Sequence, residues 1–592
     1  MKFKKKFVAL ALSSLVLGGC FSDDNTVLSA GDVFVLTSNG QLATFNRDQP
    51  SVIRTSVAVS GLMAGDTLLG MDFRPRDGQL YAIARTTTPA NGGRLYTINT
   101  TTGVATAGAI LTATLNPAAT SFAVDFNPMA DALRVIADTG ENLRIFVVDA
   151  PGMPARTAGQ TTVDGPISDL DADISGAAYT NSFDGTTSTR LLNIDTDADN
   201  LTFQNPPNDG TQVVVASLGV DAEGTAGFDI DSRNNVGYAL LNVDDNVSFY
   251  RIAIPDSTAT LPLQPTPPSM TPPTVATLIG NLNVSGIIGM ALVQPAAPQA
   301  IALDGATGGA QRLLKFGIRT PNQVTAVSVS GLAMNESLLS IDYRPANSTL
   351  YGLSSSGRIF KINPDTGAAT VASTVTIAAV NPITTGITDG RSYAIDFNPM
   401  ANALRVVSTA IDSTPDDPMD NLEDSENLRV PPTVVDGGGE SIRDIPLAFA
   451  TAPTPADFNI GQVAYTNSFA NPLPSSTRLF DIDTRNNRLL QQTNANGGVL
   501  ALIGNFSTTF NQYGGFDISG GDNGMVLMAN RPNPVVPDIN VQPFSLFSSA
   551  LVAGPAPATT VAVTPITPAS GTAVIGSGMT QATDIRALTI KF

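Results

Sequence analysis

The stretch FAVDFNPMADALRVI, residues Phe122–Ile136, decides the fold because the chain repeats it as YAIDFNPMANALRVV at Tyr393–Val407. A second stretch, TSVAVSGLMAGDTLLGMDFRP at Thr55–Pro75, returns as TAVSVSGLAMNESLLSIDYRP at Thr325–Pro345. The offset between the copies grows slowly, from 270 residues (342 − 72) to 288 residues (515 − 227). A constant order with small insertions in the second copy predicts two tandem domains of one fold.

Each copy contains a shorter period. GMDFRPRDGQLYAI at Gly70–Ile83 and AVDFNPMADALRVI at Ala123–Ile136 share one pattern, and their aspartates lie 53 residues apart (125 − 72). Between them, alternating apolar and polar residues next to turns rich in Thr and Gly predict short strands and hairpins. Four short strands in about 50 residues is the period of a propeller blade. We predict an all-β fold with two tandem β-propellers of about five four-stranded blades each; six blades and a pair of β-sandwiches are the alternatives.

The last strand of each copy lacks a blade of its own. GIIGMALV at Gly286–Val293 and RALTIKF at Arg586–Phe592 are therefore predicted to pair with the first unit of their copy. This pairing would close each ring and remove its exposed sheet edges. The predicted domain bounds are 32–295 and 299–592.

The N-terminus has the features of an export signal. Four lysines within residues 2–6 precede an apolar stretch too short to span a bilayer, which ends in Leu-Gly-Gly-Cys20. This motif resembles a bacterial lipobox, so residues 1–19 are predicted to be a lipoprotein signal peptide. Residues 20–31 would then form the lipidated cysteine and its tether. An ordinary signal peptide with a chance cysteine is the alternative.

The residue after the cysteine predicts the membrane in which the lipoprotein is anchored. Phe21, not Asp, stands there, so the inner-membrane retention signal of enteric bacteria is missing. We expect an outer-membrane lipoprotein, periplasmic or surface-exposed, that contacts the membrane through the lipid on Cys20.

Composition removes most catalytic chemistry. The chain has no histidine, no tryptophan and a single cysteine, Cys20. Histidine-based nucleophile systems, histidine-bound zinc and thiolate catalysis are thereby excluded. The net charge of −19 disfavours nucleic acid as a partner. A carboxylate-based glycosidase stays possible.

Two sets of polar residues recur in both copies. The repeated aspartates are Asp72, Asp125 and Asp229 in the first copy and Asp342, Asp396 and Asp517 in the second. We interpret them as caps of neighbouring turns, one in each blade and spread around the ring. The second set consists of Arg134, Asn142, Arg144, Arg405, Asn427 and Arg429. An internal ion pair between Arg134 and an aspartate is one interpretation of this set, and a ligand pocket in the central channel is the other.

One segment has the spacing of a calcium loop. Asp195, Asp197 and Asp199 place carboxylates at alternate positions, but the glutamate that would complete the loop is absent. We interpret the segment as a hairpin turn that could bind Ca²⁺ weakly, and we expect no other cofactor.

The phrases DFRPRDGQLYAI, YTINTTTGVAT, DFNPMADALRV, ENLR, AYTNS and GFDI resemble a bacterial family, domain of unknown function 4394. The resemblance covers nearly all of both copies. It implies a propeller-like fold in exported bacterial proteins and brings no assigned activity or catalytic residue.

These observations favour a lipid-anchored cell-envelope protein that binds or scaffolds an unknown protein or polysaccharide without catalysis. The alternative is a carboxylate-based hydrolase or lyase acting on envelope glycans. The sequence separates the two only through the repeated acids, which a catalytic pair would bring together and turn caps would keep apart.

Overall fold

The structure is a computed structural model. It describes residues 29–591 except 150–154, 169–172, 256–272, 294–297, 306–309, 378–390, 411–424, 452, 471–472, 522–524, 533–542, 550–559, 567–572 and 578–579. The predicted signal peptide, Cys20 and most of the segment 295–298, which is predicted to link the two copies, lie outside the described residues. Among the described residues, no helix combines the length and the apolar character needed to cross a membrane.

The first copy folds into five antiparallel four-stranded sheets, with the strands following one another from the centre outward. The first blade comprises β20 (Ile287–Leu292), β1 (Val33–Thr37), β2 (Gln41–Asn46) and β3 (Gln49–Ala58). The second comprises β4 (Thr67–Phe73), β5 (Leu80–Thr86), β6 (Gly92–Ile98) and β7 (Ala105–Thr114). The third comprises β8 (Phe122–Asn127), β9 (Ala132–Ala137), β10 (Asn142–Ile145) and β11 (Thr161–Val163). The fourth comprises β12 (Ile174–Tyr179), β13 (Leu191–Asp195), β14 (Asn200–Gln204) and β15 (Gln212–Ser217). The fifth comprises β16 (Gly224–Asp231), β17 (Val236–Val243), β18 (Asn246–Ile252) and β19 (Ala276–Asn281).

The second copy repeats this plan with small additions. Its first blade comprises β42 (Ile585–Lys591), β21 (Gln299–Asp304), β22 (Arg312–Gly317) and β23 (Thr325–Ser328). The next comprises β24 (Leu338–Arg344), β25 (Thr349–Ser354), β26 (Arg358–Ile362) and β27 (Ala369–Ile377). The third comprises β28 (Arg391–Asn398), β29 (Ala403–Ala410), β30 (Glu426–Val430) and β31 (Gly439–Arg443), with the helix α2 (Pro432–Gly437). The fourth comprises β33 (Ile460–Tyr465), β34 (Leu479–Asp483), β35 (Arg488–Asn494) and β36 (Val499–Phe506), with β32 (Ala448–Phe449) and β40 (Thr560–Val561) at its edge. The fifth comprises β37 (Phe510–Ser519), β38 (Met525–Pro532), β39 (Ser545–Ser549) and β41 (Val563–Pro565).

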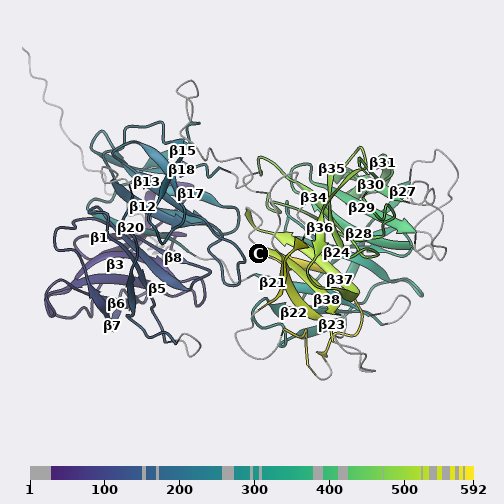
Figure 1. Ribbon diagram of the computed structural model, residues 1–592, viewed down its shortest axis with the longest axis horizontal. Coiled ribbons are helices and arrows are strands. Elements are labelled where there is room, and N and C mark those ends of the chain that lie inside the picture. Colours follow the sequence, from purple (N-terminus) through teal and green to yellow (C-terminus); the bar gives the residue numbers. More distant parts are fainter. Residues whose placement is uncertain are drawn as a thin grey trace, which may run out of the picture.

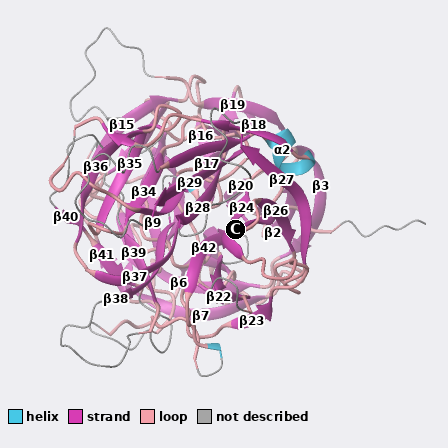
Figure 2. Cartoon of the chain, turned by 90° about the vertical axis from the view of Figure 1, so that its right-hand side faces the viewer, coloured by secondary structure: helices cyan, strands magenta, loops and turns pink. Residues whose placement is uncertain are grey.

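Both predicted closures of the rings are confirmed. β20 pairs with β1 through Val33 and Leu292, and β42 pairs with β21 through Gln299 and Lys591. In each copy the inner strands pack in a ring in which every blade contacts the next. The all-β fold and the count of five blades are therefore correct. Figure 1 shows the two propellers side by side, and Figure 2 views them along their common long direction.

The propellers are joined by more than the chain connection. Phe183, in the loop after β12, is 3% exposed and packs in the hydrophobic core of the second copy with Leu314 and Phe316. Next to it, the Oδ1 atom of Asp184 lies 3.5 Å from the Nε atom of Arg319 of the second copy. The first propeller thus inserts an aromatic side chain into the first blade of the second.

This insertion predicts coupled unfolding. Phe183→Ala should lower the free energy of unfolding by about 3–5 kcal/mol because it leaves a cavity in the core of the second propeller. Scanning calorimetry should then show the two propellers unfolding in separate transitions. Leu473→Ala, at a side chain 63% exposed, is the control and should leave the thermogram unchanged. An unaltered thermogram for Phe183→Ala would contradict the predicted contact.

Candidate functional site: the axial aspartates

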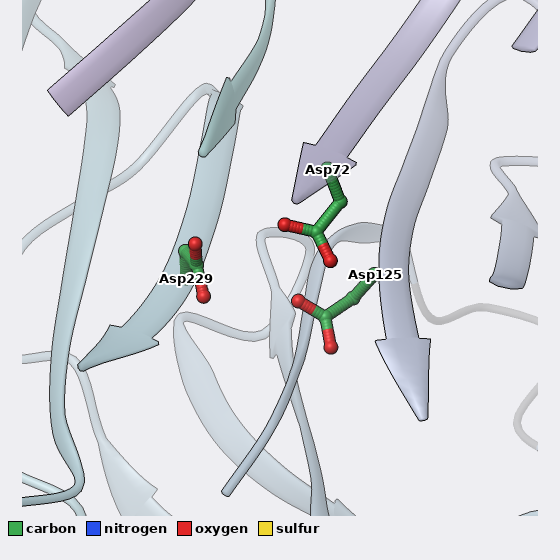
Figure 3. Close-up of side chains that lie close together, drawn as sticks. All are labelled: Asp72, Asp125 and Asp229. Atoms are coloured by element: carbon green, nitrogen blue, oxygen red, sulfur yellow. The ribbon is translucent and has the colours of Figure 1, made fainter. Parts of the chain in front are cut away.

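The repeated aspartates converge on the axis of each propeller. Asp72 lies on β4, Asp125 on β8 and Asp229 on β16, and one carboxylate oxygen from each lies within 4.8 Å of the others (Figure 3). All three side chains are 1% exposed. The second copy contains an equivalent cluster, made of Asp342, Asp396 and Asp517. We call these two groups the axial clusters.

The carboxylates bind the neighbouring blade and do not cap turns. Asp72 accepts a hydrogen bond from the backbone N–H of Phe126 at 2.8 Å, and Asp125 accepts one from Tyr179 at 2.8 Å. Asp229 accepts one from Leu292 at 2.7 Å, which links the fifth blade to the closing strand. Inner strands of different blades share no ladder of backbone hydrogen bonds, so these side chains supply the connection. The expectation of turn caps spread around the ring was wrong, because equivalent positions on inner strands all lie beside one axis.

The second copy keeps the same links. Asp342 accepts from Phe397 at 2.8 Å, Asp396 from Tyr465 at 3.0 Å and Asp517 from Ile590 at 2.6 Å. It also has a link of its own through β42. The hydroxyl of Thr589 donates to Asp342 at 2.9 Å and accepts from the N–H of Tyr343 at 3.2 Å. Thr589 was not among the predicted residues, because only the closing strand, and no repeated phrase, brings it to the axis.

Burial and mutual repulsion disfavour ionisation of the axial clusters. Burial raises the pKa of Asp229 and of Asp517 to about 7. Burial, and then the neighbouring carboxylates, raise the pKa of Asp72 and Asp125 well above the usual range. Within the described part of the chain, no basic side chain forms an ion pair with any of the six. Each cluster therefore retains protons near neutral pH, and its oxygens are also of the kind that a hard cation prefers.

A small cavity leads toward the first axial cluster. Its volume is about 140 Å³, and its walls include Gly70, Met71, Val124 and Met290 of the inner strands. The wall is largely apolar or backbone, and the carboxylates themselves do not line it. A ligand in this cavity would therefore not contact the axial carboxylates directly.

The second predicted set forms a buried network in each copy. Arg134 Nη1 donates to Asn142 and to Asp164, both at 2.7 Å, and its Nη2 donates to Asn208 at 2.9 Å. Arg144 also pairs with Asp164, at 3.0 Å. The contacts of Arg134 thus agree with its interpretation as part of an internal ion pair, and the aspartate in that pair is Asp164.

The network is repeated in the second copy. Arg405 bonds Asn427, Asp444 and Asn496 at 2.7–2.8 Å, and Arg429 pairs with Asp444 at 3.0 Å. Arg405 and Arg429 also line a surface cavity of about 490 Å³ beside the β35–β36 turn. This cavity lies at the second strand of the blade and not in the central channel, where the alternative interpretation placed it.

The calcium-like segment is a hairpin turn in the structure. Asp195 pairs with Asn200 across the turn between β13 and β14. Its Oδ1 atom accepts the N–H groups of Asp173 and Asp197, and Asp199 accepts that of Ala222. Among the described residues, these three aspartates do not form one of the clusters able to hold a metal.

The sheets and their closure define a pair of five-bladed β-propellers. The model of a family described as a domain of unknown function (DUF4394) matches residues 41–263 and 312–542. The chain belongs to this family and contains two copies of its domain.

Solved structures with some likeness are remote. The extracellular domain of BT4673 from B. thetaiotaomicron shares 12% identity, with 90% of this chain and 69% of that chain covered, at a TM-score of 0.23. The Dos1 propeller shares 11% identity, with 64% of this chain and 92% of that chain covered, at a TM-score of 0.24. None of the curated proteins compared matches the chain.

The axial clusters predict a pH dependence of stability. A folded-state pKa above the unfolded value, which is about 3.9 for Asp, gives stability that is complete below pH 4 and is lost as pH rises through about 7. The melting temperature in EDTA should therefore fall between pH 5 and pH 8. Asp125→Asn with Asp396→Asn should weaken this fall and raise the melting temperature at pH 8. Among the described residues, each of these two carboxylates accepts a single hydrogen bond, which the amide oxygen can still accept. Equal stability of the wild type at pH 5 and pH 8 would contradict the prediction.

The arginine networks predict a large effect of one carboxylate. Asp164→Ala leaves the charge of Arg134 buried without its partner, so it should cost about 3–5 kcal/mol in urea denaturation. Asp444→Ala should cost a similar amount in the second propeller. The control is Arg586→Ala, which removes an ion pair at a side chain 41% exposed and should cost less than about 1 kcal/mol. A loss for Asp164→Ala as small as that of the control would refute the structural role of the network.

Proposed function

We propose that this chain is a lipid-anchored protein of the bacterial cell envelope that binds or scaffolds another envelope component and performs no catalysis. The observation that carries the proposal is the state of the axial clusters. Their side chains are at most 5% exposed, and their oxygens hold neighbouring blades together. A scissile bond would have to replace those hydrogen bonds to reach them, which would open the ring.

The competing proposal is a carboxylate-based hydrolase. Its support is the convergence of the acids, because retaining glycosidases place two carboxyl groups about 5 Å apart. Burial weighs against it, and so does the equality of the two copies, since each cluster has three aspartates with equivalent partners. A structural role accounts for this equality directly.

A binding role agrees with the way the two propellers are held. Phe183 and Asp184 fix the first propeller on the second, so their loops form one surface of constant shape. Propeller loops vary without disturbing the blades, which suits recognition of a protein or polysaccharide. The anchor part of the proposal rests on Cys20 and the lipobox-like sequence before it. A diacylglycerol together with an amino-terminal acyl chain would hold the protein stably on a membrane.

The membrane localisation and the binding role can be tested together in the native host. Cys20→Ser should move the protein from the outer-membrane fraction to the soluble fraction, because the acceptor of the lipid is lost. The lipid-free variant should then capture an envelope component from detergent extracts, and should release no sugar from purified envelope glycans.

The membrane anchor and the non-catalytic role would each be contradicted by a different result. Membrane retention of Cys20→Ser would overturn the anchor and leave the binding role standing. Glycan release that disappears with Asp125→Asn would overturn the non-catalytic proposal in favour of the hydrolase.

A further inference from the structure

A cavity of about 350 Å³ lies between the two propellers. The first propeller contributes Arg47 and Arg233, and the second contributes Tyr343, Arg344 and Lys591. The residues from the second propeller stand at the ends of β24 and β42, where the central axis opens toward the first propeller. The volume falls within the range of small-molecule sites, about 300–1,000 Å³.

The charge of this interdomain cavity is opposite to that of the chain. Its wall contains three arginines and one lysine but a single carboxylate, Asp231, in a chain of net charge −19. Arg233 binds Asp231 through Nε and Nη2, and its side chain is still 48% exposed. Within the part of the chain that the structure describes, the Nζ atom of Lys591 forms no ion pair, although its charge helps to lower the pKa of Asp365, and it lies 5.9 Å from the centre of the Tyr343 ring. Arg47 is paired with Asp32 and Asp231, and Arg344 is paired with Asp436, so Lys591 and the exposed part of Arg233 are the charges that attract an anion to the cavity.

The hydroxyl of Tyr343 is the second observation. Tyr343 is 8% exposed and lines the cavity, and its hydroxyl has no hydrogen-bond partner among the described residues. A buried polar group without a partner costs about 1–3 kcal/mol. Burial also raises the pKa of Tyr343, so the hydroxyl remains a neutral donor. The hydroxyl oxygen itself has almost no exposed surface, so a ligand oxygen would satisfy it after a small movement of the ring.

The first copy shows that the fold does not need Tyr343 and Lys591. Phe73 occupies the position of Tyr343, directly after the equivalent aspartate, and Val293 occupies that of Lys591. The alignment is fixed by the backbone, because Leu292 and Ile590, the preceding residues, donate to the equivalent Asp229 and Asp517. The second copy therefore has a donor and a cation at the two positions where the first has apolar side chains.

The geometry points to an anion-binding site between the propellers that takes a sugar carrying a carboxylate or phosphate group. This inference rests on the proposed binding function and names its ligand class. Lys591 and Arg233 neutralise the anionic group, and the hydroxyl of Tyr343 donates to one of its oxygens. The aromatic ring of Phe469, which also lines the cavity, offers apolar surface to the sugar ring.

The experiment is isothermal titration of the full-length lipid-free protein carrying Cys20→Ser. The probes are glucuronate, glucose 6-phosphate, inorganic phosphate and glucose, each at low salt. One equivalent of glucuronate or glucose 6-phosphate should bind, which also tells the carboxylate source from the phosphate source, and glucose should not bind. Lys591→Val should weaken binding about tenfold and Tyr343→Phe about fivefold, as expected for one charge-assisted and one neutral hydrogen bond.

The variants install the residues of the first copy, so they should fold. Tyr343→Phe should keep or raise the melting temperature, because it removes a hydroxyl without a partner. Arg251→Gln, on the exposed side of β18, removes one positive charge away from the cavity and should leave binding intact.

The results separate this inference from the proposed function. Absence of binding by all anionic probes, or binding unchanged in both cavity variants, overturns the inference. Capture of an envelope component that is equally strong in those variants would then leave the binding role standing. Inorganic phosphate that binds as tightly as glucose 6-phosphate keeps the anion site and removes the sugar from its ligand class.

Discussion

The hydrogen bond from an axial carboxylate to the backbone of the next blade is the constraint on which both propellers depend. The inner strands of neighbouring blades meet without a shared ladder, and apolar packing alone does not fix their register; where two blades of the second copy do join in one sheet, they join through β27 and β31, away from the axis. Asp72, Asp125 and Asp229 fix it by accepting N–H groups from adjacent inner strands. Five blades leave a narrow axis, so one oxygen of each of the three carboxylates lies within 4.8 Å of the others, and their charges would repel one another. The raised pKa values are the energetic consequence of that geometry.

The constraint is met with different side chains where an aspartate is missing. In the first copy, Asn181 and Asn235 exchange hydrogen bonds at 2.8 Å between the fourth and fifth blades. In the second copy, Thr589 connects the closing strand to Asp342. In both cases a polar side chain forms a hydrogen bond to a group of the neighbouring blade. An ionised carboxylate is therefore not essential to the ring, which agrees with clusters that retain protons.

The periodicity of the sequence predicted the architecture well, because blades repeat and repeats are visible in residues such as Phe122–Ile136 and Tyr393–Val407. The closing strands could be predicted for the same reason. The role of Asp125 could not, since spacing along the chain shows that positions are equivalent but not how near the axis they lie. Asp164 and Asn208, which bind Arg134, were also missed, because they stand in turns outside every repeated phrase.

Asymmetry between the copies gives the molecule its distinctive surface. Phe183 and Phe469 close the same phrase, AYTNSF, yet Phe183 enters the core of the second propeller while Phe469 faces the interdomain cavity. Equivalent residues of the two copies lie in different environments, because each propeller contacts its neighbour through one side only. Replacements that leave the blade intact can then change this junction alone. Tyr343 and Lys591 are such replacements: they alter the polarity of the cavity, while Asp342 and Asp517 keep the hydrogen bonds to the next inner strand that Asp72 and Asp229 make in the first copy.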